Sequence, residues 1–225
     1  LVVRGAGLPI VGQYRLVWHA TSQGDTCPFG ASSSSLCLAP AAAITRTHLS
    51  TTGAVSSVMP HRVRTRQARL NREPEVAITT DADVVGTFLE DAAHFPGGHA
   101  PAVAYPRSEG DVAALVRDAH SVLPVGAQSS LTGGATPMGE TVVATEHLDR
   151  VISVSRSEIT VQAGVPLNVL QRELAPHGAF YPPVPTYEGA VAGGVIATNA
   201  AGAATFKYGS TRDWVHGITV VLADG

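Results

Sequence analysis

The chain has 225 residues, a formal net charge of −3 and a hydrophobic content of 44%. This length is sufficient for one large domain or two small ones with a substantial buried core. The near-neutral charge gives no reason to expect a nucleic-acid partner. No apolar run reaches the length of a membrane-spanning helix, so we expect no transmembrane segment.

Charge divides the chain near residue 72. Residues 1–72 contain eight Arg, no Lys and one acid, Asp25, whereas residues 73–225 contain seventeen acids. The Arg-rich, Ser-containing and acid-poor composition of the first segment resembles a transit peptide. We therefore expect residues 1–72 to be mostly disordered and low in complexity. We expect a cytoplasmic protein, with an organelle reached through this segment as the alternative.

Two cysteines, Cys27 and Cys37, lie in this first segment. No further ligands accompany them, so a structural zinc site is not expected. A disulfide between them would need an oxidising compartment, which nothing else in the sequence indicates. We predict free thiols and no metal.

Helix and strand signals begin at about residue 73. Residues 73–100 read as a lead-in helix and loop, with apolar residues at helical spacing across Asp81–Phe95. A short strand is predicted at Ala102–Pro106, followed by a helix for which Ser108 is the N-cap. The next strand, Ser121–Gly126, leads into a glycine-rich loop.

The second half of the chain continues this alternation. Clusters of β-branched residues predict three short strands, at 141–143, 151–154 and 159–161. A helix is predicted to follow, with Pro166 in its first turn and Gly178 past its end. The final strand is predicted at Gly217–Leu222, and the class is mixed α and β.

The loop PVGAQSSLTGGATP, residues 124–137, carries no charge. It lacks the Lys of a Walker loop and the spacing of a G-x-G-x-x-G fingerprint. Its glycines nevertheless allow backbone N–H groups to converge on an anion, and Gln128, Ser129, Ser130 and Thr132 add neutral donors. The loop therefore predicts a pyrophosphate site without cations; the alternative is a long flexible loop.

A second stretch, AVAGGVIATNAAG at 190–202, contains almost no side chain larger than Val. Such small residues allow a backbone to lie directly against a flat or extended ligand. The alternative is a close-packed buried helix, which explains the alanines better than it explains the Gly193–Gly194 pair and the adjacent Thr198 and Asn199.

Together with KYGSTRDWVHGITVVLADG, these stretches resemble the FAD-binding domain of the vanillyl-alcohol oxidase/p-cresol methylhydroxylase (PCMH) type. The likeness is nearest to the branch that contains glycolate oxidase and D-lactate dehydrogenase, and it extends over about residues 81–225. It implies an α+β fold in which two small α+β subdomains enclose an extended FAD. The PCMH-type domain would occupy residues 101–225, truncated at its C-terminal end.

The resemblance also implies which residues bind the cofactor. The FAD diphosphate would contact Gly126, Ala127, Gln128, Ser129, Ser130, Leu131, Thr132 and Gly133. The flavin or its ribityl chain would be approached by Pro185, Thr186 and Gly189. The cofactor would be lined by Gly193, Gly194, Thr198 and Asn199, beside a wall formed by Gly202, Tyr208 and Gly209. Because no His lies between His120 and His147, where relatives attach FAD covalently, we predict non-covalent FAD.

The implied function is that of a flavin-dependent oxidoreductase that oxidises a 2-hydroxy acid, of the D-lactate or glycolate type, by hydride transfer to FAD. The alternatives are an alcohol, sugar lactone or phenol as substrate, or a truncated chain without catalytic activity. In the family a cap domain follows the VVLADG turn and supplies the catalytic base. We therefore assign no catalytic residue within residues 1–225. The substrate is expected to be a small molecule, and nothing in the sequence indicates the electron acceptor.

Overall fold

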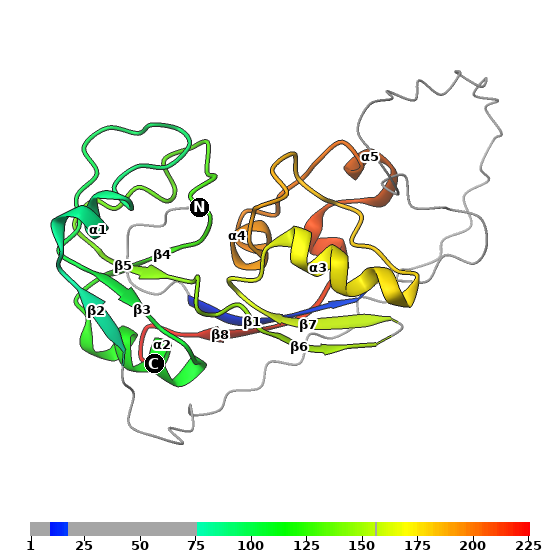
Figure 1. The fold of residues 1–225 in the computed structure, drawn as a ribbon, viewed down its shortest axis with the longest axis horizontal. Coiled ribbons are helices and arrows are strands. Elements are labelled where there is room, and N and C mark those ends of the chain that lie inside the picture. Colours follow the sequence, from blue (N-terminus) through cyan, green and yellow to red (C-terminus); the bar gives the residue numbers. More distant parts are fainter. Residues whose placement is uncertain (1–9, 18–75, 156) are drawn as a thin grey trace, which may run out of the picture. The chain divides into compact units, whose positions relative to one another are not determined.

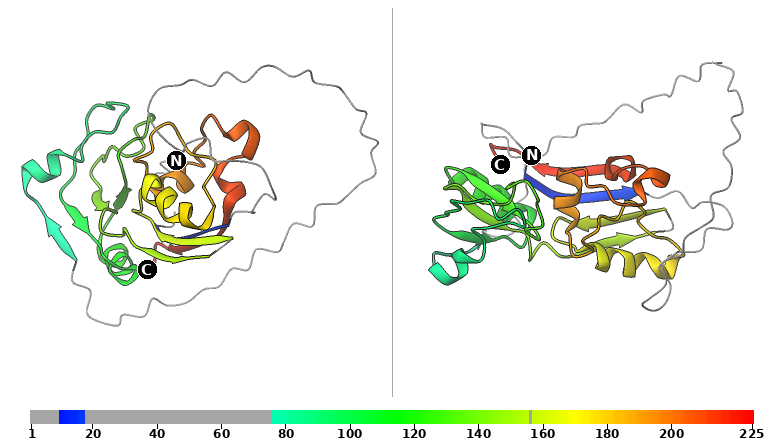
Figure 2. Two further views of the ribbon diagram at one scale, coloured as in Figure 1. Left: turned by 45° about the vertical axis from the view of Figure 1, so that its right-hand side comes forward. Right: turned by 90° about the horizontal axis from the view of Figure 1, so that it is seen from above.

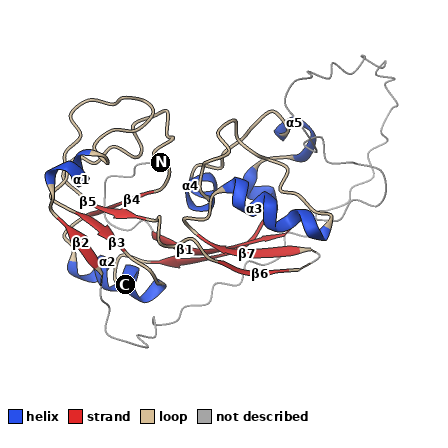
Figure 3. Cartoon of the chain, in the orientation of Figure 1, coloured by secondary structure: helices blue, strands red, loops and turns tan. Residues whose placement is uncertain are grey.

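The computed structural model describes residues 10–17, 76–155 and 157–225. The strands of these residues form two four-stranded sheets (Figure 1). For residues 10–17 only the backbone is described. All described residues belong to one compact unit. The helices and strands are shown by type in Figure 3.

The first sheet has the strand order β2-β3-β5-β4. Its strands are β2 (Ala77–Thr79), β3 (Val103–Tyr105), β5 (Thr141–Ala144) and β4 (Val122–Val125). β3, β5 and β4 run parallel, and β2 pairs antiparallel with β3. The carboxyl ends of the three parallel strands therefore meet at one edge, which is where open α/β sheets bind ligands.

Alternate side chains of the first sheet pack into two separate clusters. Val103 and Val142 pack with Val85 of α1 (Ala82–Gly86). Their neighbours in sequence, Ala104 and Val143, pack with Leu115 of α2 (Glu109–Asp118). Successive side chains of a strand point to opposite faces, so α1 and α2 cover opposite faces of this sheet.

The second sheet is antiparallel throughout, with the order β6-β7-β1-β8. Its strands are β6 (Val151–Val154), β7 (Glu158–Gln162), β1 (Ile10–Val17) and β8 (Val215–Val221). α3 (Leu167–Leu174) and α4 (Ala192–Ala197) both pack on this sheet (Figures 1 and 2). Their buried side chains, including Leu170 and Val195, form one core with Ile159 and Val161 of β7.

Three short helical turns complete the second half of the chain. They are η1 (Ala175–His177), α5 (Thr205–Tyr208) and η2 (Thr211–Trp214). The α+β class and the division into two small α+β parts, each built on one sheet, are confirmed.

Local end signals in the sequence predicted the start of α2 and the region of α3. The Ser108 side chain accepts a hydrogen bond from the N–H of Asp111 at the start of α2. Pro166 is the N-cap of α3, and Gly178 adopts φ of 66° after η1. The predicted strand at Gly217–Leu222 is confirmed as β8, which begins two residues earlier, at Val215.

The helix predicted over Asp81–Phe95 is wrong in its length, because α1 ends at Gly86. The Thr87 hydroxyl donates to the Val84 carbonyl oxygen and closes the last turn. Beyond it, the buried Asp91 carboxylate accepts hydrogen bonds from the N–H groups of Ala93 and Ala135. Residues 87–95 are therefore held by contacts with the distant loop, which helical periodicity does not reveal.

The expectation of a disordered first segment is wrong for residues 10–17, which form β1 between β7 and β8. The sequence IVGQYRLV alternates apolar with polar residues at several positions, as strands do. Pairing on both sides satisfies its backbone donors and acceptors. The remainder of residues 1–72, including Cys27 and Cys37, lies outside the described residues.

Candidate functional site

The glycine-rich loop follows β4 at the carboxyl edge of the parallel strands. Gln128 anchors it with a left-handed backbone, φ of 52°. Its side-chain Nε2 donates to the carbonyl oxygens of Thr87, at 2.8 Å, and Glu90, at 2.9 Å. Its own carbonyl oxygen accepts from the Ala92 N–H at 2.9 Å. Gln128 therefore fixes the loop to the segment after α1, and its side-chain Nε2 is occupied by these two hydrogen bonds.

Ser130 organises the second half of the loop. Its Oγ accepts hydrogen bonds from the N–H groups of Thr132, at 3.3 Å, and Gly134, at 3.2 Å. It also lies 3.3 Å from Thr132 Oγ1. Gly133 adopts φ of 73°, and a Cβ there would lie 2.8 Å from the Phe95 ring. Ser129, by contrast, is exposed, and its hydroxyl has no partner among the described residues.

The backbone of this loop offers a row of unused donors. Within the part of the chain that the structure describes, the N–H groups of residues 126–131 have no hydrogen-bond acceptor. Backbone N–H groups rarely stay unpaired unless water or a ligand satisfies them. Converging N–H groups in a glycine-rich turn are suited to phosphate oxygens. The N–H groups of residues 126–131 are therefore available to a diphosphate held by neutral groups.

Gly126 joins this loop to the second small-residue stretch. A Cβ at Gly126 would lie 2.4 Å from Cγ2 of Val191, the N-cap of α4, so any other residue would require the Val191 side chain to shift. The start of α4 is itself fixed, because the N–H groups of Ala192 and Gly193 donate to Val165 and Ala163. The structure thus brings two predicted cofactor-binding stretches side by side.

The exposed side of α4 is lined by small groups. A Cβ at Gly194 would have no neighbour closer than 3.9 Å. Thr198 is exposed, and its hydroxyl donates to the Gly194 carbonyl oxygen at 2.8 Å. Asn199 has φ of 48°, and its Oδ1 accepts from the Arg212 N–H at 2.9 Å. These two polar side chains therefore hold the chain itself, and the Asn199 amide nitrogen is left without a partner among the described residues.

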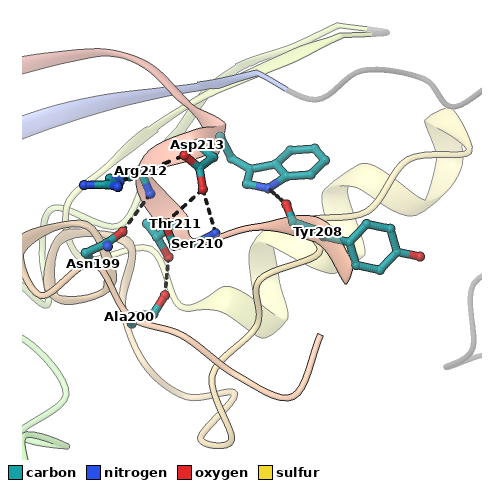
Figure 4. A network of polar contacts seen from close by, with 8 residues as sticks. Asn199, Ala200, Tyr208, Ser210, Thr211, Arg212 and Asp213 are labelled. Atoms are coloured by element: carbon teal, nitrogen blue, oxygen red, sulfur yellow. Dashed lines mark hydrogen bonds and ion pairs between the residues drawn. The ribbon is translucent and has the colours of Figure 1, made fainter. Parts of the chain in front are cut away.

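Gly202 and Gly209 shape the chain beyond α4. A Cβ at Gly202 would lie 1.9 Å from the Val184 carbonyl oxygen and 3.2 Å from Pro185 Cα, so this approach also requires glycine. Gly209 adopts φ of 83° after α5. The Tyr208 carbonyl oxygen accepts from Trp214 Nε1 at 2.9 Å (Figure 4).

The remaining predicted residues are less closely tied to this group. Thr186 is exposed, and no described contact places it against another predicted residue. A Cβ at Gly189 would lie 2.7 Å from the ring of Tyr187. Ala127 is half-buried and Leu131 is 78% exposed. Val191, which faces Gly126, was not predicted from the sequence, because no motif marks it.

The described residues offer neither a metal centre nor a membrane span. They contain no group of three His, Cys, Asp or Glu residues able to hold a metal ion. No helix among them is both long and apolar enough to span a bilayer.

Replacing Gly194 with alanine is expected to separate stability from ligand binding. Alanine is favoured over glycine inside a helix by about 1 kcal/mol, and the added methyl group would make only an ordinary contact, 3.9 Å from Val191 Cγ2. The free energy of unfolding should therefore rise in urea titrations. If the cofactor lies on this face, the same methyl group should weaken its binding severalfold. Unchanged affinity in a fluorescence titration would place the cofactor elsewhere.

Comparison with known proteins adds independent findings. A family model described as an FAD binding domain matches residues 100–225. The chain is 38% identical over 132 residues to a D-2-hydroxyglutarate dehydrogenase of Xanthomonas citri pv. viticola, covering 55% of this chain and 28% of that protein. It is 37% identical over 122 residues to a D-lactate dehydrogenase of Anaerostipes hadrus, covering 51% and 26%. The chain thus spans little more than a quarter of the length of these relatives.

The fold also has a counterpart among solved structures. An alkyldihydroxyacetonephosphate synthase superposes with a TM-score of 0.54 at 22% identity, over 60% of this chain and 28% of that one. At this identity the likeness concerns the fold alone. The family model, in contrast, covers more than half of the chain and includes both glycine-rich stretches. The chain belongs to the FAD binding domain family.

Proposed function

We propose that the chain holds FAD non-covalently and forms the FAD-binding part of an oxidoreductase that acts on a 2-hydroxy acid. The observation that carries the proposal is the row of N–H groups at residues 126–131, which lack acceptors among the described residues and begin at Gly126, close to Val191 at the start of α4. The row is suited to the diphosphate, and the open face at Gly194 leaves room for a flat or extended group. When bound, FAD supplies the hydride acceptor, and the protein supplies binding and orientation.

The proposed contacts follow the order of the chain. Residues 126–133 donate to the diphosphate through backbone N–H groups and the exposed Ser129 hydroxyl. Gly193, Gly194, Thr198 and Asn199 line the cofactor along α4. Pro185, Thr186 and Gly189 approach the flavin or ribityl chain, and Gly202, Tyr208 and Gly209 form the wall beside it. No charged side chain occurs in residues 124–137, so the loop binds the diphosphate without a cation.

Non-covalent binding is supported by the residues near the loop. Neither His nor Cys occurs in residues 121–146, so the loop offers no imidazole or thiol to attach the flavin. The FAD-binding domain is proposed to occupy residues 101–225, with 73–100 as its lead-in, and the family match to 100–225 supports this range. The sheets on which the domain is built also include β1, from residues 10–17, and β2. A cytoplasmic location is proposed on composition, with residues 1–72 as an alternative organelle signal.

The substrate class is supported by the relatives, which are named for D-2-hydroxyglutarate and D-lactate. It is tested by mixing the FAD-loaded chain anaerobically with D-lactate, D-2-hydroxyglutarate or glycolate and following the visible absorbance of the flavin. Bleaching by a D-2-hydroxy acid, and not by its L-enantiomer, is the expected result. Bleaching by an alcohol, sugar lactone or phenol alone would reassign the substrate. A flavin that no compound reduces would identify the chain as a cofactor-binding part without activity of its own.

A further inference from the structure

A buried chain of hydrogen bonds joins Tyr181 to the end of α4. The Tyr181 hydroxyl lies 2.8 Å from Thr211 Oγ1, and Thr211 Oγ1 donates to the Ala200 carbonyl oxygen at 2.7 Å. Tyr181 is 3% exposed and Thr211 is fully buried. The single hydroxyl proton of Thr211 is used on Ala200, so Tyr181 is the donor to Thr211. Burial raises the pKa of Tyr181 to about 12, so this donor stays protonated even in alkaline solution.

The other end of this chain is fixed to α3. Gln171 Nε2 donates to the Tyr181 carbonyl oxygen at 2.7 Å, and the Tyr181 N–H donates to Gln171 Oε1 at 3.0 Å. This paired contact fixes the backbone of Tyr181 against a helix that packs on the second sheet. The Tyr181 hydroxyl therefore has a defined position from which to hold Thr211.

Thr211 belongs to a turn that is itself well fixed (Figure 4). The Asp213 carboxylate accepts from Ser210 N at 2.8 Å and from Ser210 Oγ at 3.0 Å, and these hydrogen bonds lower the pKa of Asp213. Two consecutive residues of the turn then hold two consecutive residues after α4. Thr211 contacts Ala200, and the Arg212 N–H contacts Asn199. η2 is thus hydrogen-bonded to residues 199 and 200, where the chain turns away from α4.

The segment after α4 carries Asn199, with its left-handed φ of 48°, and leads to Gly202, whose close approach to Val184 fixes the next turn. We propose that Thr211, held by Tyr181, is a positioning residue that sets the Asn199–Gly202 segment against the bound FAD. Thr211 itself is fully buried and acts only through this segment. The inference rests on the proposed function, because it assigns these residues to the same cofactor site.

The test uses four variants of the 225-residue chain. Thr211→Val keeps the shape of the side chain and removes its hydroxyl, whereas Thr211→Ser keeps the hydroxyl. Tyr181→Phe removes only the donor to Thr211 and is the milder change if Thr211→Val folds poorly. Ser108→Ala is the matched control, because it removes the cap of α2 and lowers stability at a place outside the proposed site. FAD affinity, thermal stability and the visible circular dichroism of the bound flavin are measured for each.

Thr211→Val is expected to weaken FAD binding about tenfold and to change the flavin circular dichroism at saturation. Thr211→Ser, which keeps the hydroxyl, should have the FAD affinity and the flavin circular dichroism of the unchanged chain. Tyr181→Phe should weaken FAD binding about threefold. Ser108→Ala should lower the melting temperature and leave affinity and spectrum unchanged. Equal affinity and spectrum in Thr211→Val, or losses in Thr211→Ser as large as in Thr211→Val, would overturn the positioning role alone. Failure of the unchanged chain to bind FAD would contradict the proposed function and, with it, this inference.

Discussion

Replacing Ser129 with aspartate is expected to weaken FAD binding on the order of 100-fold and to leave the fold intact. The side chain is exposed and has no hydrogen bond among the described residues, so its replacement removes no contact. The new carboxylate would lie beside the row of N–H groups at residues 126–131, where the diphosphate is proposed to bind. Like charges a few ångströms apart at a protein surface repel by roughly 1–4 kcal/mol, and each 1.4 kcal/mol is about a tenfold change in affinity.

The matched control for this variant is Ser121→Asp. Ser121 is also exposed and precedes β4, so it introduces the same charge at the other end of the strand. Both variants should melt within a degree or two of the unchanged chain, and only Ser129→Asp should lose FAD in a fluorescence titration. Equal affinity in the two variants would show that the diphosphate does not bind at this loop.

Replacing Gly202 with alanine is expected to lower the free energy of unfolding by about 2–3 kcal/mol, which lies within the range measured for overpacked sites. The added Cβ would lie 1.9 Å from the Val184 carbonyl oxygen, and a backbone atom cannot rotate away as a flexible side chain can. The segment after α4 would have to move away from Val184 and Pro185. FAD affinity should therefore fall together with stability.

Gly86→Ala provides the control for an added methyl group. Gly86 is the last residue of α1, and a Cβ there would meet nothing within 4 Å. Urea titrations should show a stability equal to or above that of the unchanged chain. A Gly202→Ala variant as stable as Gly86→Ala would mean that the chain around Val184 relaxes at little cost. That result would contradict the claim that the approach of Gly202 to Val184 requires glycine.

The fold was predictable wherever its cause is local. Ser108 caps α2 and Gly178 ends η1 through contacts within a few residues, and both follow from residue type and spacing. β1 was missed because the strands that pair with it, β7 and β8, lie far along the chain. Residues 10–17 are held as a strand by this long-range pairing, which the local sequence does not reveal. The helix at 81–95 was overextended for a similar reason, since Asp91 bonds to Ala135 in the distant loop.

The candidate site divides in the same way. Gly126 was predicted from the residues of its loop and Gly202 from the family resemblance. The structure gives a physical reason for a glycine at both positions, because each faces an atom that a Cβ would strike. The polar residues of the loop were predicted as ligand donors. In the structure the side chains of Gln128 and Ser130 hold the loop, and the N–H groups of residues 126–131 are without acceptors among the described residues. The Tyr181–Thr211 pair was not predictable, because two hydroxyl residues thirty positions apart carry no motif.

The central claim is that this chain binds FAD without a covalent bond. Equilibrium dialysis of the 225-residue chain against FAD, followed by acid precipitation, tests it directly. We predict about one flavin per chain at saturation, with all of the flavin released into the acid supernatant. A chain that is folded by circular dichroism and retains no flavin at saturating FAD, or a flavin that precipitates with the protein, would contradict the claim.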